Sequence, residues 1–232
     1  MRAGLIVVNT NPLYTPREMA HQFKDAGVKA VLILSNFCHN LVQILDKTNI
    51  KHVLVTELGD MLGFPKKQIV NFVVKYIKKM VPAYDLPNSI PFTQALQEGA
   101  GLSLKAPNID CEDIALLQYT GGTPGISKGA MLTHRNITAN MEMISAWMNG
   151  EANRFEEGNE TVITALPLYH IFAFTLNCLT MVKHGAHGIL IVNPRDIDTF
   201  VKTLQKHPFS LFTGVNTLFN ALINHPNISE VD

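Results

Sequence analysis

Short continuous runs of valine, isoleucine and leucine alternate with segments of helical pattern along most of this chain of 232 residues. The first part predicts strands at residues 5–8, 28–34 and 52–55, and the helices between them include one over residues 37–47. Continuous apolar strands that are linked by helices are typical of a parallel sheet buried on both faces. The alternation therefore predicts an α/β fold of parallel sheets with helices on both faces.

The first helix carries its own boundary signals. Thr15 stands at the expected cap, Pro16 follows at the first helical position, and Glu18 lies three residues after the threonine. This spacing is a capping box, in which each of the two side chains accepts a hydrogen bond from the other residue's backbone N–H. Gly27 is expected to end the helix.

Residues 57–110 interrupt the alternation and indicate a division of the chain. A helix is predicted over residues 66–80, and a loop-rich stretch that contains several prolines then runs to Pro107. We expect residues 1–107 to form one α/β subdomain, and residues 108–232 to form a second one that carries a glycine-rich loop. The pattern there predicts helices at 136–148, 171–183, 197–206 and 217–223, and strands at 161–166, 188–192 and 210–213.

Composition and spacing exclude several classes of partner. Lysine plus arginine and aspartate plus glutamate both number 19, so no overall charge favours a nucleic acid. The cysteines, Cys38, Cys111 and Cys178, are scattered singly, which fits a reducing, cytoplasmic compartment. The histidines show no metal-binding spacing, so a zinc site is not expected. The longest apolar run, residues 171–182, is too short to span a bilayer.

The most informative motif lies in residues 117–136, Leu-Gln-Tyr-Thr-Gly-Gly-Thr-Pro-Gly-Ile-Ser-Lys-Gly-Ala-Met-Leu-Thr-His-Arg-Asn. Glycines surround two threonines and one serine there, and Lys128 follows the serine. The backbone N–H groups of such a loop can turn inward around an anion, while hydroxyls and an ammonium reach the same phosphates. Apolar residues on both sides predict that the loop joins two short strands. Phosphate binding is therefore preferred over the alternative of a plain glycine-rich hairpin turn.

The end of this loop disfavours one class of phosphate-binding protein. A Walker A loop requires Gly-Lys-Ser/Thr at the start of a helix. Here Ser127 precedes Lys128, and Gly129 follows it. A P-loop phosphotransferase is for this reason not expected.

Four spaced segments resemble one known family. Residues 119–129, followed by 131–136, resemble the AMP-binding signature of adenylate-forming enzymes, most closely that of bacterial long-chain fatty acid–CoA ligases. Residues 8–18, 165–172 and 212–222 resemble the same group. Members of that family begin well upstream of this chain and continue into a Gly-Tyr-Gly-x-Thr-Glu segment, a Thr-Gly-Asp segment and a C-terminal domain with a catalytic lysine. The resemblance therefore implies an internal fragment of the large N-terminal domain.

The resemblance also implies a reaction and a nucleotide site. ATP and a fatty acid would give acyl-AMP and pyrophosphate, with Mg²⁺ as cofactor, and the acyl group would then pass to coenzyme A. In the family, Thr120 would lie at the metal and Lys128 would act in catalysis by neutralising the departing pyrophosphate. The implied nucleotide-binding residues are Tyr119, Thr120, Gly121, Gly122, Thr123, Pro124, Gly125 and Lys128.

The loop departs from the family at two positions. Proline occupies position 124 where the family usually has threonine, and Ser127 stands where it usually has proline. Pro124 removes one N–H and one hydroxyl from the phosphate site and fixes φ near −65°. Either the loop tolerates this change or nucleotide binding is impaired. A non-catalytic nucleotide-binding remnant thus stays open as an alternative, and the genomic sequence on either side would discriminate it.

A second group of residues is implied for the acyl substrate. His170 follows Pro-Leu-Tyr after a predicted strand, and the resemblance places it near the reacting carboxylate in a catalytic and substrate-binding role. The alternative is a buried histidine whose ring is satisfied by a backbone carbonyl. The residues that the resemblance places along an acyl tunnel are Phe172, Phe174, Gly214, Val215 and Leu218. All are equally compatible with the core, and for the phenylalanines the core is the preferred interpretation.

The helix predicted over residues 66–80 is basic and amphipathic. Its lysines, at positions 66, 67, 75, 78 and 79, flank an apolar set formed by Ile69, Phe72, Val73, Tyr76, Ile77 and Met80. Such a helix can lie on an anionic membrane, here the inner face of the cell membrane. The preferred interpretation is an ordinary surface helix that packs its apolar face on the domain. Whether the protein forms a homodimer is left open.

Overall fold

The computed structural model describes residues 1–120, 127–150 and 155–231, and the chain divides into two compact units. The first unit comprises residues 1–109 and 115–131, and the second comprises residues 110–114 and 132–232. From the sequence we expect the boundary between the two subdomains at Pro107. Residues 115–131 instead group with the first unit, because the strand that they form pairs with the N-terminal strand.

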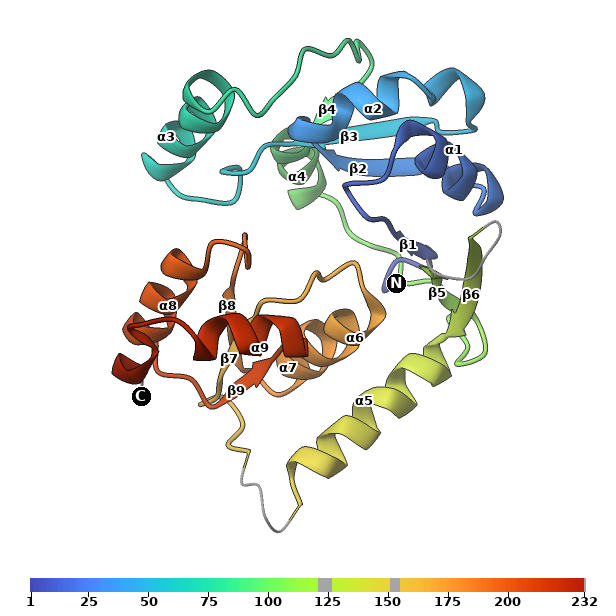
Figure 1. Ribbon diagram of the computed structural model, residues 1–232. Coiled ribbons are helices and arrows are strands. Elements are labelled where there is room, and N and C mark those ends of the chain that lie inside the picture. Colours follow the sequence, from blue (N-terminus) through green and yellow to red (C-terminus); the bar gives the residue numbers. More distant parts are fainter. Residues whose placement is uncertain (121–126, 151–154, 232) are drawn as a thin grey trace. The chain divides into compact units, whose positions relative to one another are not determined.

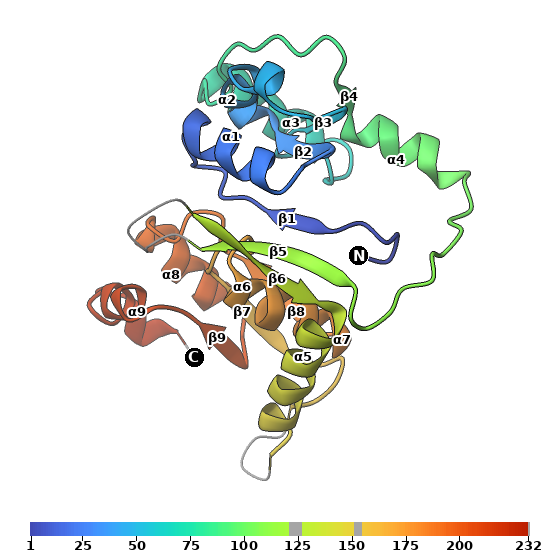
Figure 2. The same ribbon diagram turned by 90° about the vertical axis from the view of Figure 1, so that its right-hand side faces the viewer.

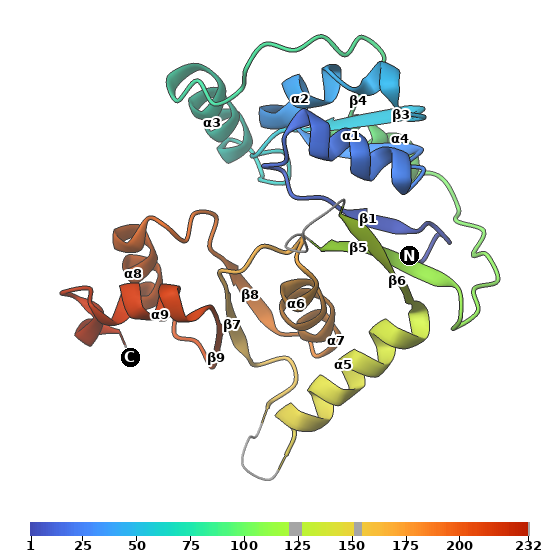
Figure 3. The same ribbon diagram turned by 45° about the vertical axis from the view of Figure 1, so that its right-hand side comes forward.

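The first unit contains two sheets (Figure 2). Its elements are β1 (Val7–Asn9), α1 (Pro16–Asp25), β2 (Ala30–Leu34), α2 (Cys38–Val42), β3 (His52–Thr56), α3 (Lys66–Phe72), the π-helix η3 (Val73–Ile77), β4 (Ile90–Pro91), α4 (Phe92–Ala100), and most of β5 (Ile114–Thr120) and β6 (Lys128–Thr133). Strands β2, β3 and β4 form a parallel sheet. A second sheet has the order β1-β5-β6, in which β1 and β5 are parallel (Figure 3).

The place of β1 corrects one expectation. The alternation of strands and helices predicts that β1, β2 and β3 share one sheet, because consecutive strands of this kind are usually neighbours. Instead Val7 pairs with Leu116, and Asn9 pairs with Gln118. Strand β1 thus pairs with β5, which lies more than a hundred residues later in the sequence. This pairing supports β5, the strand that precedes the glycine-rich loop.

Helix α1 has the capped start that the sequence predicts. The Thr15 hydroxyl accepts from the Glu18 N–H at 3.3 Å, and the Glu18 carboxylate accepts from the Thr15 N–H at 2.8 Å. Gly27 follows the helix with a positive φ of 61°. The buried face of α1 carries Met19 and Phe23 into the main core of this unit. The other buried members of that core are Ile33, Cys38, Leu41, Ile44, Val53 and Leu86.

Two further elements of this unit differ from the prediction. The helix expected over residues 66–80 forms as α3 and then widens into the π-helix η3, which ends at Ile77. The stretch expected to be loop-rich contains α4, which begins directly after Pro91. The prolines around this segment led to the wrong prediction of a loop, although proline is tolerated at the start of a helix.

The second unit is a parallel sheet with helices on both faces (Figure 1). Its elements are α5 (His134–Met148), β7 (Thr161–Thr164), α6 (Ile171–Ala173), the π-helix η4 (Phe174–Thr180), α7 (Met181–Lys183), β8 (His187–Leu190), α8 (Ile197–Lys206), β9 (Leu211–Thr213) and α9 (Asn216–Ile223). The strand order is β8-β7-β9, and both pairs are parallel.

Strand β7 shows how both faces of this sheet are covered. Val162 and Ile163 are fully buried neighbours, and successive residues of a strand point to opposite faces. Val162 packs with Met148 and Met181, which belong to α5 and α7. Ile163 packs with residues of α8 and α9, among them Phe200. The α/β architecture with helices on both faces is therefore confirmed in this unit. Within the part of the chain that the structure describes, no helix is long and apolar enough to cross a membrane.

Candidate functional site

The glycine-rich loop connects two strands, as the sequence predicts. Strand β5 ends at Thr120, and β6 begins at Lys128. Gly121, Gly122, Thr123, Pro124 and Gly125, which the resemblance assigns to the nucleotide, lie outside the described residues. The structure accordingly shows how the two ends of the loop are held.

Tyr119 lies at the first end of the loop and is buried. Its hydroxyl donates to the Asp25 carboxylate at 2.5 Å. Burial, and then the hydrogen bond to this carboxylate, raise the Tyr119 pKa well above its ordinary value. The ring packs against Gly129, where an added Cβ would lie 2.9 Å from two ring carbons. Tyr119 is therefore fixed in place, with its hydroxyl already engaged by the protein.

The second end of the loop is held by α1, the helix that also provides Asp25. His21 Nε2 lies 2.9 Å from the Ser127 carbonyl oxygen. Since a carbonyl can only accept, this nitrogen must carry the proton. Lys128, the next residue, has an exposed side chain at the start of β6. Its ammonium is therefore accessible directly after the loop.

Neither His21 nor Asp25 was singled out by the sequence analysis, although a signal existed. Residues four apart in a helix share one face, so His21 and Asp25 must point in the same direction from α1. Their neighbour Gln22 is buried and donates to the Asn9 carbonyl oxygen at 3.0 Å, which ties α1 to β1. The missing information was the distant position of the loop, which no local pattern gives.

The residues proposed for the acyl substrate belong to the second unit. His170 precedes α6 and is exposed, so the alternative of a buried histidine does not hold in this structure. Phe172 and Val215 are about half exposed, at 48% and 52%. Gly214 and Val215 directly follow β9, which pairs with β7 in parallel. The segments that follow β7 and β9 therefore leave the sheet at the same edge, where open α/β sheets bind ligands.

Two other members of this group lie deeper. Leu218 is buried in the core formed with α8, so its side chain contributes to packing. An added Cβ at Gly214 would lie 3.0 Å from the Phe219 ring, so glycine permits a close approach there. His170, Phe172 and Val215 thus have side chains accessible to a substrate.

A buried polar cluster lies at the same edge of this sheet and was missed in the sequence. Asn177, in η4, accepts from the Thr213 hydroxyl at 2.9 Å. Its amide nitrogen lies 3.4 Å from the Thr164 hydroxyl. All three side chains are buried, and they join η4 to the last residues of β7 and β9. Buried polar groups of this kind fix the arrangement of the elements that they connect.

A serine–histidine–glutamate chain also occurs in the second unit, but its geometry is structural. Ser145 Oγ lies 2.7 Å from His184 Nε2, and His184 Nδ1 lies 3.0 Å from Glu157. Ser145 also donates to the Met141 carbonyl oxygen at 2.8 Å, so its single proton is not directed at the histidine. Both Ser145 and His184 are buried. This series of hydrogen bonds therefore connects α5 to the segment after α7 and is no hydrolytic site.

The described residues contain no group of three His, Cys, Asp or Glu side chains that could hold a metal ion. This matters for Mg²⁺, which usually binds through one or two protein ligands together with substrate phosphates. Thr120, the one residue of this chain that the resemblance assigns to the metal, is the last residue of β5. Magnesium sites of that kind take their remaining ligands from phosphates and water.

The amino-acid sequence is similar to that of known proteins along its whole length. The family model described as AMP-binding enzyme matches residues 1–232. The long-chain-fatty-acid–CoA ligase of Salmonella typhimurium is 53% identical over 232 residues, which are 100% of this chain and 41% of that ligase. The long-chain-fatty-acid–CoA ligase of Bacillus subtilis is 36% identical, over 99% of this chain and 40% of its own length.

A solved structure shows the same fold. The anthranilate CoA ligase AuaEII, in complex with anthranoyl-AMP, has a TM-score of 0.75 and 17% sequence identity to this chain. The similarity covers 98% of this chain and 38% of that protein. The chain thus spans about two fifths of the length of the curated relatives that it matches.

Proposed function

Because this chain belongs to the AMP-binding enzymes, we propose that the whole protein activates a long-chain fatty acid with ATP and transfers the acyl group to coenzyme A. The observation that carries this proposal is the strand–loop–strand motif in which Lys128 begins the second strand. The motif lies in a chain whose 232 residues are 53% identical to the matching part of a curated ligase. The rival interpretation, a non-catalytic remnant, has no comparable support from the relatives.

The reaction explains why the loop needs its residue types. A fatty acid carboxylate would attack the α-phosphorus of ATP, and negative charge would develop on the departing pyrophosphate. Preorganised N–H donors and a nearby cation stabilise such charge. The exposed Lys128 would supply the cation from this chain. Bound Mg²⁺ would neutralise further charge on the phosphates, with Thr120 as its contact from this chain.

The acyl substrate would contact the second unit. His170 would lie near the reacting carboxylate, and Phe172, Gly214 and Val215 would line the path of the acyl chain. The support is their shared position at the carboxyl edge of the β8-β7-β9 sheet and the exposure of three of these side chains. Gly214 leaves room there that a larger residue would fill.

The test uses a ligase of family length in which residues 1–232 of this chain replace the matching region of the Salmonella enzyme. ATP–pyrophosphate exchange is measured with fatty acids of increasing length. We expect exchange with long-chain acids and a loss of about 10²-fold in Lys128→Ala. Lys105→Ala, an exposed lysine of the same unit, is the matched control. A folded chimera without exchange would favour the remnant, and equal effects of the two substitutions would remove the role of Lys128.

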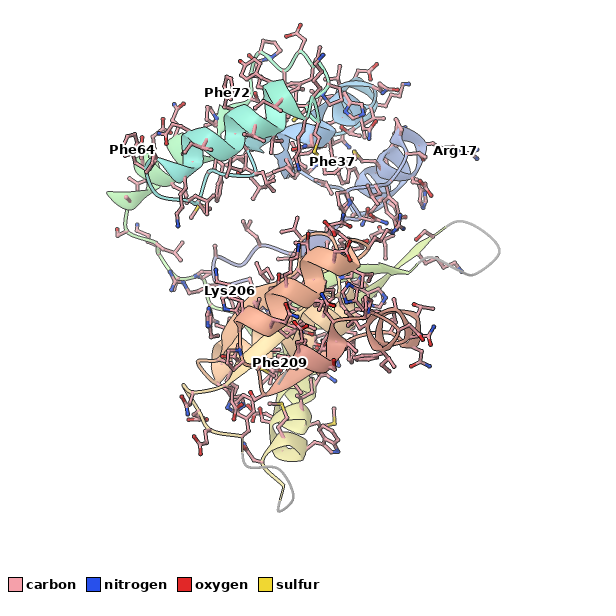
Figure 4. All side chains as sticks on the ribbon, turned by 60° about the vertical axis from the view of Figure 1, so that its left-hand side comes forward. Arg17, Phe37, Phe64, Phe72, Lys206 and Phe209 are labelled. Carbon is pink, nitrogen blue, oxygen red and sulfur yellow. The ribbon has the colours of Figure 1, made fainter. Side chains whose placement is uncertain are left out.

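We further propose that the whole protein contacts anionic membranes through α3 and η3, the basic helix. The support is that most of the apolar side chains predicted to pack on the domain are exposed, contrary to the preferred interpretation of the sequence, although Val73 is half-buried and Val74 is buried. Phe64, before the helix, is 86% exposed (Figure 4). The exposed apolar residues of the helix and its end are Ile69, Phe72, Tyr76, Ile77 and Met80, each 53–65% exposed.

Charge and anchoring agree with this surface. Lys75 Nζ lies 5.5 Å from the centre of the Tyr76 ring, so a cation and an aromatic ring are presented together. The helix is held on the other side by Asn71, whose side chain bonds to the Glu57 carboxylate at 2.8 Å and to the Gly59 N–H at 2.7 Å. A basic helix with an exposed apolar face suits the boundary between lipid headgroups and acyl chains.

Vesicle co-sedimentation tests the membrane contact. Lys75→Glu/Lys78→Glu/Lys79→Glu should bind anionic vesicles at least tenfold more weakly than the unchanged protein, and the difference should shrink with added salt. Lys47→Glu/Lys51→Glu changes exposed lysines elsewhere in the unit and should have little effect. Equal sedimentation of the triple variant and the unchanged protein would refute the contact.

A homodimer is a separate proposal with narrower support. Met143 and Trp147 lie four residues apart on α5 and are 63% and 75% exposed. An exposed apolar pair of this kind suits a contact between copies. Light scattering should give twice the chain mass for the unchanged protein and the chain mass for Trp147→Glu; a monomer in both cases excludes the dimer.

A further inference from the structure

One face of α1 contacts both residues that flank the loop which the proposed function uses. His21 and Asp25 share this face, and each makes a hydrogen bond with a residue that flanks the loop. The Asp25 carboxylate accepts a hydrogen bond of 2.5 Å from the hydroxyl of Tyr119, which lies on β5 before the loop. His21 donates to the Ser127 carbonyl at 2.9 Å on the leaving side. A single helix thus holds the chain both before and after residues 121–126.

The helix itself is firmly placed, so it can serve as a support. Phe23 and Met19 are buried in the core of the first unit, and Gln22 bonds to the backbone of β1. Strand β1 in turn pairs with β5 through Asn9 and Gln118, directly before Tyr119. The attachments of His21 and Asp25 therefore connect the loop ends to the core by short, well-packed routes.

We propose that His21 and Asp25 are positioning residues for the phosphate loop: they fix the separation and direction of its two ends. This inference rests on the proposed binding of ATP at the loop. Closing a loop costs conformational entropy, and fixing its two ends before the ligand binds removes part of that cost from the binding step. Support of this kind determines how precisely a binding group is presented. Neither residue is assigned a contact with the nucleotide.

The first test needs no nucleotide. Hydrogen exchange of the backbone amides of residues 117–120 and 127–131 is measured in the 232-residue chain. His21→Ala and Asp25→Ala should each speed this exchange about tenfold, as expected for loss of a hydrogen bond that involves a charged or strongly polar group. His52→Ala and Asp46→Ala remove an exposed histidine and an exposed aspartate of the same unit and should leave it unchanged.

The second test separates positioning from general stability. In the chimeric ligase, His21→Ala and Asp25→Ala should raise the KM for ATP about tenfold, while the KM for the fatty acid stays near the parent value. The melting temperature should fall only by the few degrees that the loss of one hydrogen bond explains. His21→Gln keeps an N–H donor, and Asp25→Asn keeps an oxygen acceptor, so both should restore most of the ATP affinity.

The outcomes are distinct. Unchanged exchange at the loop ends in both alanine variants overturns the proposal. Faster exchange with an unchanged KM for ATP also overturns it, because the attachment would then serve the fold alone. A parent chimera that turns over no substrate refutes the proposed function, whereas the exchange of the loop-end amides still decides whether α1 holds the loop.

Discussion

Gly129 offers the sharpest test of how the loop is built. It is the second residue of β6, and its Cα faces the ring of Tyr119. A Cβ at this position would lie 2.9 Å from both Cε2 and Cζ of that ring and 3.3 Å from its hydroxyl oxygen. The ring cannot move away freely, because its hydroxyl is bonded to Asp25 and its side chain is buried. Gly129→Ala therefore forces either strand β6 or Tyr119 to shift.

The size of the effect follows from either response. Overpacking of a buried contact costs about 1–3 kcal/mol, and loss of the Tyr119–Asp25 hydrogen bond would cost a similar amount, about 1.5–3 kcal/mol. For a chain of this length, 1 kcal/mol lowers the melting temperature by about 2–4 °C. Gly129→Ala should therefore lower it by about 2–12 °C. Removal of the ring removes the obstacle, so the same change should cost almost nothing in a Tyr119→Ala background.

Thermal unfolding, followed by circular dichroism, measures these differences. The matched control is Gly99→Ala, in α4, where an added Cβ would meet no atom within 4 Å. Alanine is the better helix former, so this control should raise stability by up to about 1 kcal/mol. If both alanine variants behave alike, or if Gly129→Ala costs as much without the Tyr119 ring, the close approach of Gly129 to that ring is refuted.

Four other predictions concern the loop and its surroundings. Pro124→Thr, measured by calorimetry in the chimeric ligase, should tighten ATP binding about tenfold because it returns a donor and a hydroxyl; unchanged binding would show a loop shaped around proline. The 232-residue chain alone should show no ATP–pyrophosphate exchange above a protein-free control, because the remaining family motifs supply much of the transition-state stabilisation. Asn177→Leu should destabilise the second unit by about 1–3 kcal/mol in denaturant titrations, since it leaves the buried Thr213 hydroxyl without its acceptor; an unchanged midpoint would refute this. Burial works to raise the Asp60 pKa, but the Glu57 N–H and Lys67 outweigh it and hold the pKa below its ordinary value. The stability that this carboxylate gives α3 is therefore present above the ordinary aspartate pKa and is lost as the pH falls through the lowered one, so Asp60→Asn should flatten the acid limb of the stability curve.

Local signals in the sequence predicted the local structure well. The spacing of Thr15, Pro16 and Glu18 specifies a capping box by itself, because all of its bonds lie within four residues. Val162 and Ile163, the consecutive aliphatic residues of β7, likewise require cover on both faces of the sheet, and helices supply it. The flanks of the glycine-rich loop predicted two strands, and both are present.

Pairings between distant residues could not be predicted in this way. Nothing in residues 7–9 indicates that β1 pairs with β5 rather than with β2. The inward face of the helical run 171–183 was not predictable for a related reason. Its threonines and Asn177 interrupt an apolar segment, yet these polar residues face the interior and Phe172 and Val182 are exposed. The buried partners Thr164 and Thr213 come from strands elsewhere in the sequence, so the inward direction was not visible in the run.

The site itself shows the same division between local and distant information. The residue types of the loop indicate phosphate chemistry, but the described contacts that hold its ends come from α1, about a hundred residues earlier. A substitution in the loop therefore leaves the attachment of its two ends to α1 in place. Because the cost of closing a loop grows only slowly with its length, the ends and their direction matter more than any one interior residue for keeping the loop closed. On this argument the change at Pro124 should alter the strength of individual phosphate contacts, whereas the loss of His21 or Asp25 should weaken all of them together.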